Sequence, residues 1–201
     1  DEYFEKVNSL NWIAGPAEVK LTNQGIIKIF DNEEALVGED AIQIMYWINA
    51  LEFDIDVFVR DENGYTDYSY KDEGYVELDD WKDVNPDDYL KEMRSYIKEN
   101  NELRKKRGHN LVTSIDWFQK PTLNREKNSV YYATSVKFDN GEIAINASLL
   151  LLGRHGYTES TYVANVEYFK THGKNQLNSI MLNYDFIPEK SYEKFTTGDK
   201  V

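Results

Sequence analysis

The sequence predicts an α+β fold, an antiparallel sheet with a C-terminal four-strand meander, packed by a long central helix and a C-terminal helix. Three observations predict it. Four strand-like segments follow one another between residues 111 and 164, a long helical pattern precedes them, and a shorter one follows. Because the amphipathic helices must bury an apolar stripe and the sheet an apolar face, this order favours an α/β sandwich.

The N-terminal third predicts a hairpin, a helix and a further strand. Ala17–Leu21 alternates apolar and charged residues, and the turn Thr22–Gly25 returns the chain into Ile26–Phe30. Asp40–Leu51 has apolar residues at helical spacing, although its Ile and Trp content leaves a strand open as an alternative. Phe53–Val59 alternates Phe53, Ile55, Val57 and Val59 with Asp54 and Asp56, which predicts a strand.

The long central helix is expected over Pro86–Arg107. Asn85 can cap its N-terminus, and proline is favoured at the first helical position. The carboxylates of Asp87 and Asp88 lie where the helix dipole favours negative charge, and Gly108 can end the helix.

The meander and the C-terminal helix occupy the rest of the chain. Asn140-Gly141 is a strong two-residue hairpin signal, and Ala147–Leu152 is apolar without alternation, which predicts a central strand covered on both faces. A helix is expected over Lys174–Tyr184. The four predicted strands are Leu111–Phe118, Val130–Phe138, Glu142–Leu152 and Tyr157–Ala164.

Composition limits the class of protein. The 201 residues predict a single soluble domain spanning residues 1–201, and the net charge of −13 argues against nucleic acid as a partner. The same charge argues against docking on anionic lipid through a polybasic patch. The chain has no cysteine, which excludes thiol nucleophiles, cysteine-based zinc sites and disulfides.

No known catalytic motif is present, so no catalytic residue is predicted. The chain lacks a GxSxG elbow, a glycine-rich phosphate loop, an SxxK motif and an HExxH motif. This favours a non-enzymatic role and leaves an enzyme as an alternative. A noncanonical site would have to be built from residues that lie far apart in the sequence.

The acidic stretch between residues 61 and 88 suggests calcium as the one conceivable cofactor. Calcium takes several carboxylate and carbonyl oxygens, but the glycine spacing here does not match an EF-hand. The alternative is a pair of solvated loops before the long helix. The candidate metal ligands are Asp61, Asn63, Asp67 and Asp72.

Two further groups of residues are candidate binding sites. Arg154 could clamp an anion and His155 could carry a proton, or Gly156 could permit a tight bend while Arg154 pairs with a carboxylate. Four tyrosines could anchor a partner, or could pack across neighbouring strands of a half-buried sheet. These are Tyr65, Tyr68, Tyr70 and Tyr75.

The order of several motifs resembles one family over nearly the whole chain. They include LNWIAGPAEVKL near the start, YSYKDEGYVELDDW, the corner LLLLGRHGY and the tail YDFIPEKSYEKFTTGDKV. The sequence is identified as similar to the bacterial domain-of-unknown-function 2167 family, described as predicted membrane-anchored proteins. The layout also resembles, more weakly, the PsbP and Mog1-like α/β sandwiches.

The resemblance implies an extracytoplasmic domain of the cell envelope, held to the membrane by an anchor outside this chain, with envelope proteins as partners. The first functional hypothesis is therefore non-enzymatic binding or assembly. A second is an envelope hydrolase with a noncanonical site near Arg154 and His155. A third is a binding module stabilised by calcium.

Overall fold

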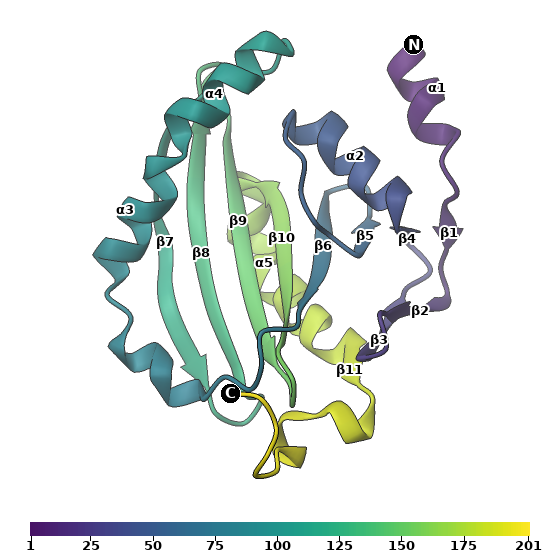
Figure 1. The fold of residues 1–201 in the computed structure, drawn as a ribbon. Helices are drawn as coiled ribbons and strands as arrows, with labels where there is room; N and C mark the ends of the chain where they lie inside the picture. The colour runs from purple at the N-terminus through teal and green to yellow at the C-terminus, as the bar shows by residue number, and fades with distance from the viewer.

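The computed structural model describes residues 1–201 and contains two antiparallel sheets (Figure 1). The larger has eight strands in the spatial order β1 (Ile13–Ala14), β4 (Glu34–Val37), β5 (Val57–Arg60), β6 (Gly64–Lys71), β10 (Tyr157–Asn165), β9 (Ile143–Leu152), β8 (Ser129–Phe138) and β7 (Val112–Asn124). The smaller has the order β11 (Tyr184–Phe186), β3 (Gly25–Ile29) and β2 (Ala17–Leu21).

The predicted meander is confirmed, because β7, β8, β9 and β10 pair in sequence as antiparallel neighbours. The turn between β8 and β9 contains Gly141 at φ +88°, the left-handed region that glycine adopts at least cost. The edge strand β7 continues to Asn124 instead of ending at Phe118. Its pairing with β8 shifts register three times, and such bulges bend a strand.

One strand in the middle of the chain was not predicted. Between the turn at Asn63-Gly64 and the loop at Asp72–Gly74 lies the eight-residue strand β6, and β5 begins only at Val57 instead of Phe53. Alternating tyrosine, threonine and serine favour a strand with one face buried, and the acidic neighbours obscured that pattern. The predicted turn at Asn63-Gly64 is present and joins the two strands.

The predicted helices form with changed ends. α2 (Glu39–Asn49) is a helix and not a strand. The central helix divides at Tyr96 into α3 (Pro86–Ser95) and α4 (Ile97–Lys106), where the Ser95 hydroxyl donates to the Glu92 carbonyl and competes with the helical ladder. Asn85 caps α3 as predicted, accepting from the amide of Asp87 at 2.9 Å.

The C-terminal helix is longer than predicted. α5 (Val166–Asn183) begins directly after β10, where the Asn165 side chain accepts from the amide of Glu167 at 2.9 Å. A short N-terminal helix, α1 (Glu2–Asn8), was not predicted. Three 3-10 turns complete the fold: η1 (Leu78–Asp83), η2 (Pro188–Lys190) and η3 (Tyr192–Lys194). None of the helices is both long and apolar enough to span a membrane.

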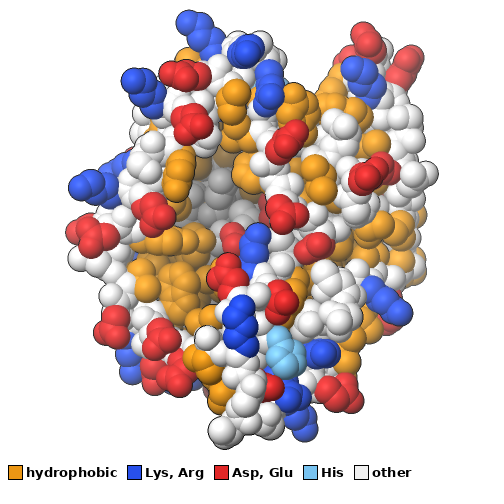
Figure 2. All heavy atoms as spheres, viewed as in Figure 1, with side chains coloured by type: hydrophobic (Ala, Val, Ile, Leu, Met, Phe, Trp, Pro, Cys, Tyr) orange, Lys and Arg blue, Asp and Glu red, His pale blue; other side chains and the backbone are white.

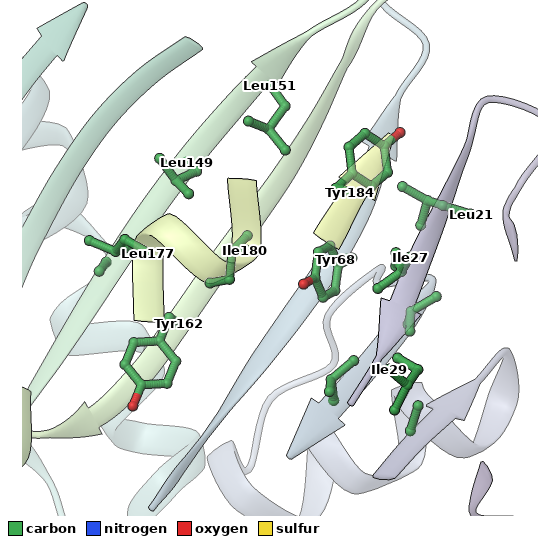
Figure 3. Packing of buried hydrophobic residues seen from close by; sticks show 14 of the residues in the cluster. Leu21, Ile27, Ile29, Tyr68, Leu149, Leu151, Tyr162, Leu177, Ile180 and Tyr184 are labelled. Carbon is green, nitrogen blue, oxygen red and sulfur yellow. The ribbon is translucent and has the colours of Figure 1, made fainter. Parts of the chain in front are cut away.

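The main core lies between the back face of the large sheet, α5 and the small sheet. Figure 3 shows Leu149 and Leu151 of β9 near Leu177 and Ile180 of α5, with Leu21 and Ile27 across from them on the small sheet. Apolar residues of β9 also face the opposite side, so this strand is central and covered on both faces, as predicted.

Candidate functional site

The front face of the large sheet, which faces the viewer in Figure 1, carries two separate apolar clusters. One lies under α2 and includes Leu36, Ile44 and Phe58. The other lies under η1 and α3 and includes Leu78 and Leu150. Figure 2 shows the surface hollowed between the α3–α4 side and the α2 side, and we call this hollow the front cleft.

A polar pocket of about 220 Å³ opens in this region of the front face. Its walls come from α2, from the connection between α2 and β5, and from strands β6, β9 and β10. We call it the acid pocket, because its charged lining residues are Asp54, Asp67 and Glu159 against the single cation Lys71.

Sheet register brings the two buried acids together. Asp67 on β6 is paired with Thr161 on β10, and Ser69 with Glu159. Asp67 and Glu159 are therefore diagonal neighbours on the same face, a relation that places Cα atoms roughly 7–8 Å apart in an antiparallel pair. Lys71 follows on the same face of β6, and none of these three charged groups has an ion-pair partner within 4.0 Å.

Burial shifts the titration of both acids. Burial, helped by the charge of Glu159 and opposed by Lys71, raises the pKa of Asp67 to about 7. Burial also raises the pKa of Glu159, again against the effect of Lys71. Asp67 keeps part of its surface open to the pocket although protein surrounds it on most sides. A pocket of this kind favours the binding of a cation, because a nearby positive charge lowers the pKa of both carboxyl groups and favours their ionised form.

Two arginines fasten the helices on either side of the acid pocket. The buried Arg104 of α4 donates from Nη1 to the carbonyl of Asn49 at 2.9 Å and from Nε to the carbonyl of Asn110 at 2.6 Å. Arg107 donates to the carbonyl of Ala50. Cations at the C-terminal carbonyls of a helix are stabilised by its dipole, so these bonds hold the end of α2 against α4.

Hydroxyl groups continue across the sheet from the acid pocket. The Oγ of Ser148 lies 3.1 Å from Oγ1 of Thr161, and the next strand presents Tyr132 beside Ser148. The hydroxyl of Tyr89, on α3, donates to that of Tyr132 at 3.0 Å. The strip therefore offers uncharged hydrogen-bonding groups beside the charged pocket.

Arg154 lies away from the cleft, at the turn between β9 and β10, where it pairs with the C-terminal tail. Its Nε donates to Asp199 Oδ2 at 2.8 Å and its Nη2 to Oδ1 at 3.1 Å, a two-pronged pair. Further bonds reach Thr196 Oγ1 and the Glu189 carbonyl, each at 3.4 Å. The Arg154 side chain holds the pKa of Asp199 down at about 2, helped by the Thr196 amide.

The same corner binds the tail through backbone groups. The carbonyl of His155 accepts from the amide of Gly74 at 2.9 Å, and the Lys200 carbonyl accepts from the amide of Tyr75 at 2.7 Å. The ring of Tyr75 stacks on Phe195 with centroids 4.0 Å apart. Arg154 and Tyr75 therefore hold the tail at this corner, while the His155 carbonyl bonds the segment that follows β6.

The other tyrosine candidates are dispersed. Tyr65 lines the acid pocket and stacks on Phe58 with centroids 5.1 Å apart. Tyr68 is buried in the main core, and Tyr70, on the same face of β6, is partly buried and packs against that core. The structure does not bring the four together into one exposed cluster.

The candidate metal ligands are also dispersed. The Oδ1 of Asp61 accepts from the amides of Asn63 and Gly64 within the turn, whereas Asp67 lies in the acid pocket and Asp72 is exposed after β6. No three His, Cys, Asp or Glu side chains form a group that could hold a metal ion.

Comparison with known families gives one match. Residues 13–201 fit the model described as "Protein of unknown function (DUF2167)". The chain belongs to the DUF2167 family. No curated protein matches the chain.

Among solved structures, this DUF2167 chain is similar to cyanobacterial PsbP (CyanoP) from Synechocystis sp. PCC 6803. The sequences are 10% identical, the match covers 89% of this chain and 93% of that one, and the TM-score is 0.46.

Three charged pocket residues of this DUF2167 member were missed by sequence reasoning: Asp54, Glu159 and Lys71. A signal for Glu159 was present, since it is a charged residue in the interior of a predicted strand. Charged side chains are seldom buried there without a reason. Lys71 lies in β6, a strand that was not predicted, so its face could not be assigned.

Proposed function

We propose that this protein is a binding or assembly module of the bacterial cell envelope and not an enzyme. We further propose that its acid pocket receives one cationic side chain, lysine or arginine, from an envelope protein partner. The observation that carries the proposal is the pair of half-buried acids, Asp67 and Glu159, that no cation within the protein neutralises at ion-pair distance.

Size and charge support a side chain as the guest. A cavity of about 220 Å³ is below the roughly 300–1,000 Å³ of sites for drug-sized ligands, so it suits a single side-chain group. Three acids against Lys71 leave an excess of negative charge for a cation to balance. Tyr65 and Phe53 supply apolar surface for the aliphatic stem.

The direct test is calorimetric titration with N-acetyl-arginine methylamide and N-acetyl-lysine methylamide. We expect dissociation constants in the millimolar range, about −4 kcal/mol, because the probe carries only one anchoring group. The double variant Asp67→Asn/Glu159→Gln is expected to lose at least tenfold in affinity. Asp31→Asn, an exposed loop acid, is the matched control and should bind like the wild type.

The neutral probe N-acetyl-glutamine methylamide supplies the second control. Should it bind as well as the cationic probes, or should the double variant keep full affinity, the acid pocket is not the cation site. Affinity should also rise about tenfold between pH 6 and pH 8, because a cation binds the ionised form of Asp67, whose pKa is about 7.

The two alternatives have weaker support. A hydrolase near Arg154 would need a guanidinium that is already bonded to Asp199, and the carbonyl of His155 accepts from the amide of Gly74. A calcium-stabilised module would gain about 2.7 kcal/mol at 100 times its dissociation constant. Thermal melts with excess calcium test it, and an unchanged melting temperature removes that alternative.

We infer the envelope location from the family resemblance and from the absence of cysteine, which is compatible with an extracytoplasmic domain. Protease treatment of cells with permeabilised outer layers and intact inner membranes tests it. Digestion of the domain supports an extracytoplasmic address held by a membrane anchor. Protection until the inner membrane is lysed would contradict it.

A further inference from the structure

A second cavity, unrelated to the acid pocket, opens between α5 and the far ends of β7 and β8. Its volume of about 660 Å³ lies within the roughly 300–1,000 Å³ typical of small-molecule sites. We call it the apolar groove, because most of its contact surface comes from carbon-rich side chains. These include Phe118, Leu123, Tyr131, Phe169, Leu177 and Met181.

The course of β7 explains why the groove is open. Register shifts between Trp117 and Thr122 bend this edge strand, and Pro121 within the bend lacks an amide hydrogen to donate. α5 packs over β9 and β10, so the flaring end of β7 is left without a helix against it. Phe118 meets Phe169 edge to face, with centroids 5.4 Å apart, and is still 42% exposed.

The charged residues that line the groove are three cations, Arg125, Lys170 and Lys174, against one acid, Glu126, in a protein whose net charge is −13. Lys170 and Lys174 lie one helical turn apart on α5, and both line the groove. Lys170 is 3.8 Å from Glu167, and Arg125 is paired with Asp79 at 2.6 Å. Lys174 has no acidic partner within 4.0 Å, so its ammonium group is free to meet an anion.

We propose that the apolar groove binds a long-chain fatty-acid anion. The acyl chain lies against Leu123, Phe169 and Leu177, and the carboxylate meets the ammonium groups of Lys170 and Lys174. The groove should prefer an anionic head group, because the two lysines would repel the head group of a cationic amphiphile of equal chain length. Each additional buried methylene should strengthen binding about fourfold until the groove is filled.

The test is titration of the whole chain with dodecanoate and decanoate below their micelle concentrations, followed by calorimetry and by chemical shifts of the Met181 methyl group. Dodecanoate should bind at least tenfold more tightly than decanoate, since two methylenes separate them. Dodecyltrimethylammonium is the reference amphiphile of opposite charge and should bind at least tenfold more weakly than dodecanoate.

Two variants separate the head group from the chain. Lys174→Glu should weaken dodecanoate at least tenfold and leave dodecanol unchanged, while Lys98→Glu, an exposed lysine of α4, is the charge-matched control. Phe118→Ala, at an exposed aromatic position, should weaken both ligands. Asp67→Asn should leave dodecanoate binding unchanged, so this proposal and that for the acid pocket fail independently.

Three results would overturn the proposal. One is equal affinity for the anionic and cationic amphiphiles. Another is unchanged dodecanoate binding in both Lys174→Glu and Phe118→Ala, provided each variant melts like the wild type. The third is binding to anionic phospholipid vesicles without binding of free dodecanoate, which would assign the lysines to a membrane surface.

Discussion

Asp199 and Asp67 are the same residue type in opposite electrostatic situations. Asp199 is gripped by Arg154 and has a pKa of about 2, whereas burial raises the pKa of Asp67 to about 7 with no cation at ion-pair distance. The first carboxylate has its partner inside the protein and fastens the tail. The carboxylate of Asp67 is desolvated and has no cationic partner within the protein, so we interpret the acid pocket as a site for a cation from another molecule.

The two regions meet at the end of β6. Gly156, directly after the Arg154-His155 pair, lies so close to β6 that an added Cβ would be 1.9 Å from the Lys71 carbonyl oxygen. Lys71 in turn lines the acid pocket. Changes at the corner can therefore reach the pocket through the backbone of one strand.

The largest effect is expected from Gly156→Ala. The added methyl group must displace the backbone of β6 at Lys71, so we expect a loss of about 2–4 kcal/mol in the free energy of unfolding. Urea denaturation measures it. Gly141→Ala, which faces open space but has φ +88°, is the reference and should lose about 1–2 kcal/mol from backbone strain alone. Equal losses in the two variants would contradict the close approach.

The next effect is expected from Asp67→Asn, which should stabilise the protein at high pH. The folded pKa of about 7 lies above the ordinary 3.8, so the native state retains a proton that the unfolded state loses within this window. Stability from this group is therefore complete below pH 4 and lost as the pH rises to 7. Asparagine should gain about 1–3 kcal/mol at pH 8 and nothing near pH 4.

Urea denaturation of the wild type and Asp67→Asn at pH 4, 6 and 8 measures this difference. Asp31→Asn should show no such trend, because Asp31 is an exposed loop residue. A gain in Asp67→Asn that does not depend on pH would mean that packing, and not the charge of Asp67, is responsible.

The smallest global effect is expected from Arg154→Met and Asp199→Asn. Both should release the tail, seen as faster amide hydrogen exchange at Tyr75 and Thr196, with the sheet protected. The lowered pKa of Asp199 contributes stability that is present above pH 4 and lost as the pH falls towards 2. Exchange rates in the double variant equal to those in each single variant would verify that the two side chains act as a pair.

Local signals predicted much of the fold. The Asn140-Gly141 hairpin, the Asn85 cap and the apolar run Ala147–Leu152 each depend on neighbours in sequence, and each is present in the structure. The hairpin loop differs in length, because its closing bond between Phe138 and Glu142 encloses three residues instead of the predicted two. The division of the central helix at Tyr96 and the extension of β7 were missed. These depend on a local side-chain bond and on the bending of an edge strand, which apolar periodicity does not record.

Only part of the candidate site could be predicted from the sequence. Asp67 and Tyr65 were singled out, but as members of a calcium loop and a tyrosine cluster. The pairing of Asp67 with Glu159 depends on the register between β6 and β10, strands that lie far apart in sequence. The carboxylate partner of Arg154 was anticipated as a type, yet nothing in the sequence identified it as Asp199.

The tail contacts also determine how the molecule would bear tension. The last residues are bonded to Tyr75, just after β6, and to Arg154, between β9 and β10 (Figure 1). A pulling force applied at Val201 would therefore load the Arg154–Asp199 pair and the Lys200 carbonyl first, and would be delivered into the middle of the large sheet. The force would load α5 only after these bonds had broken.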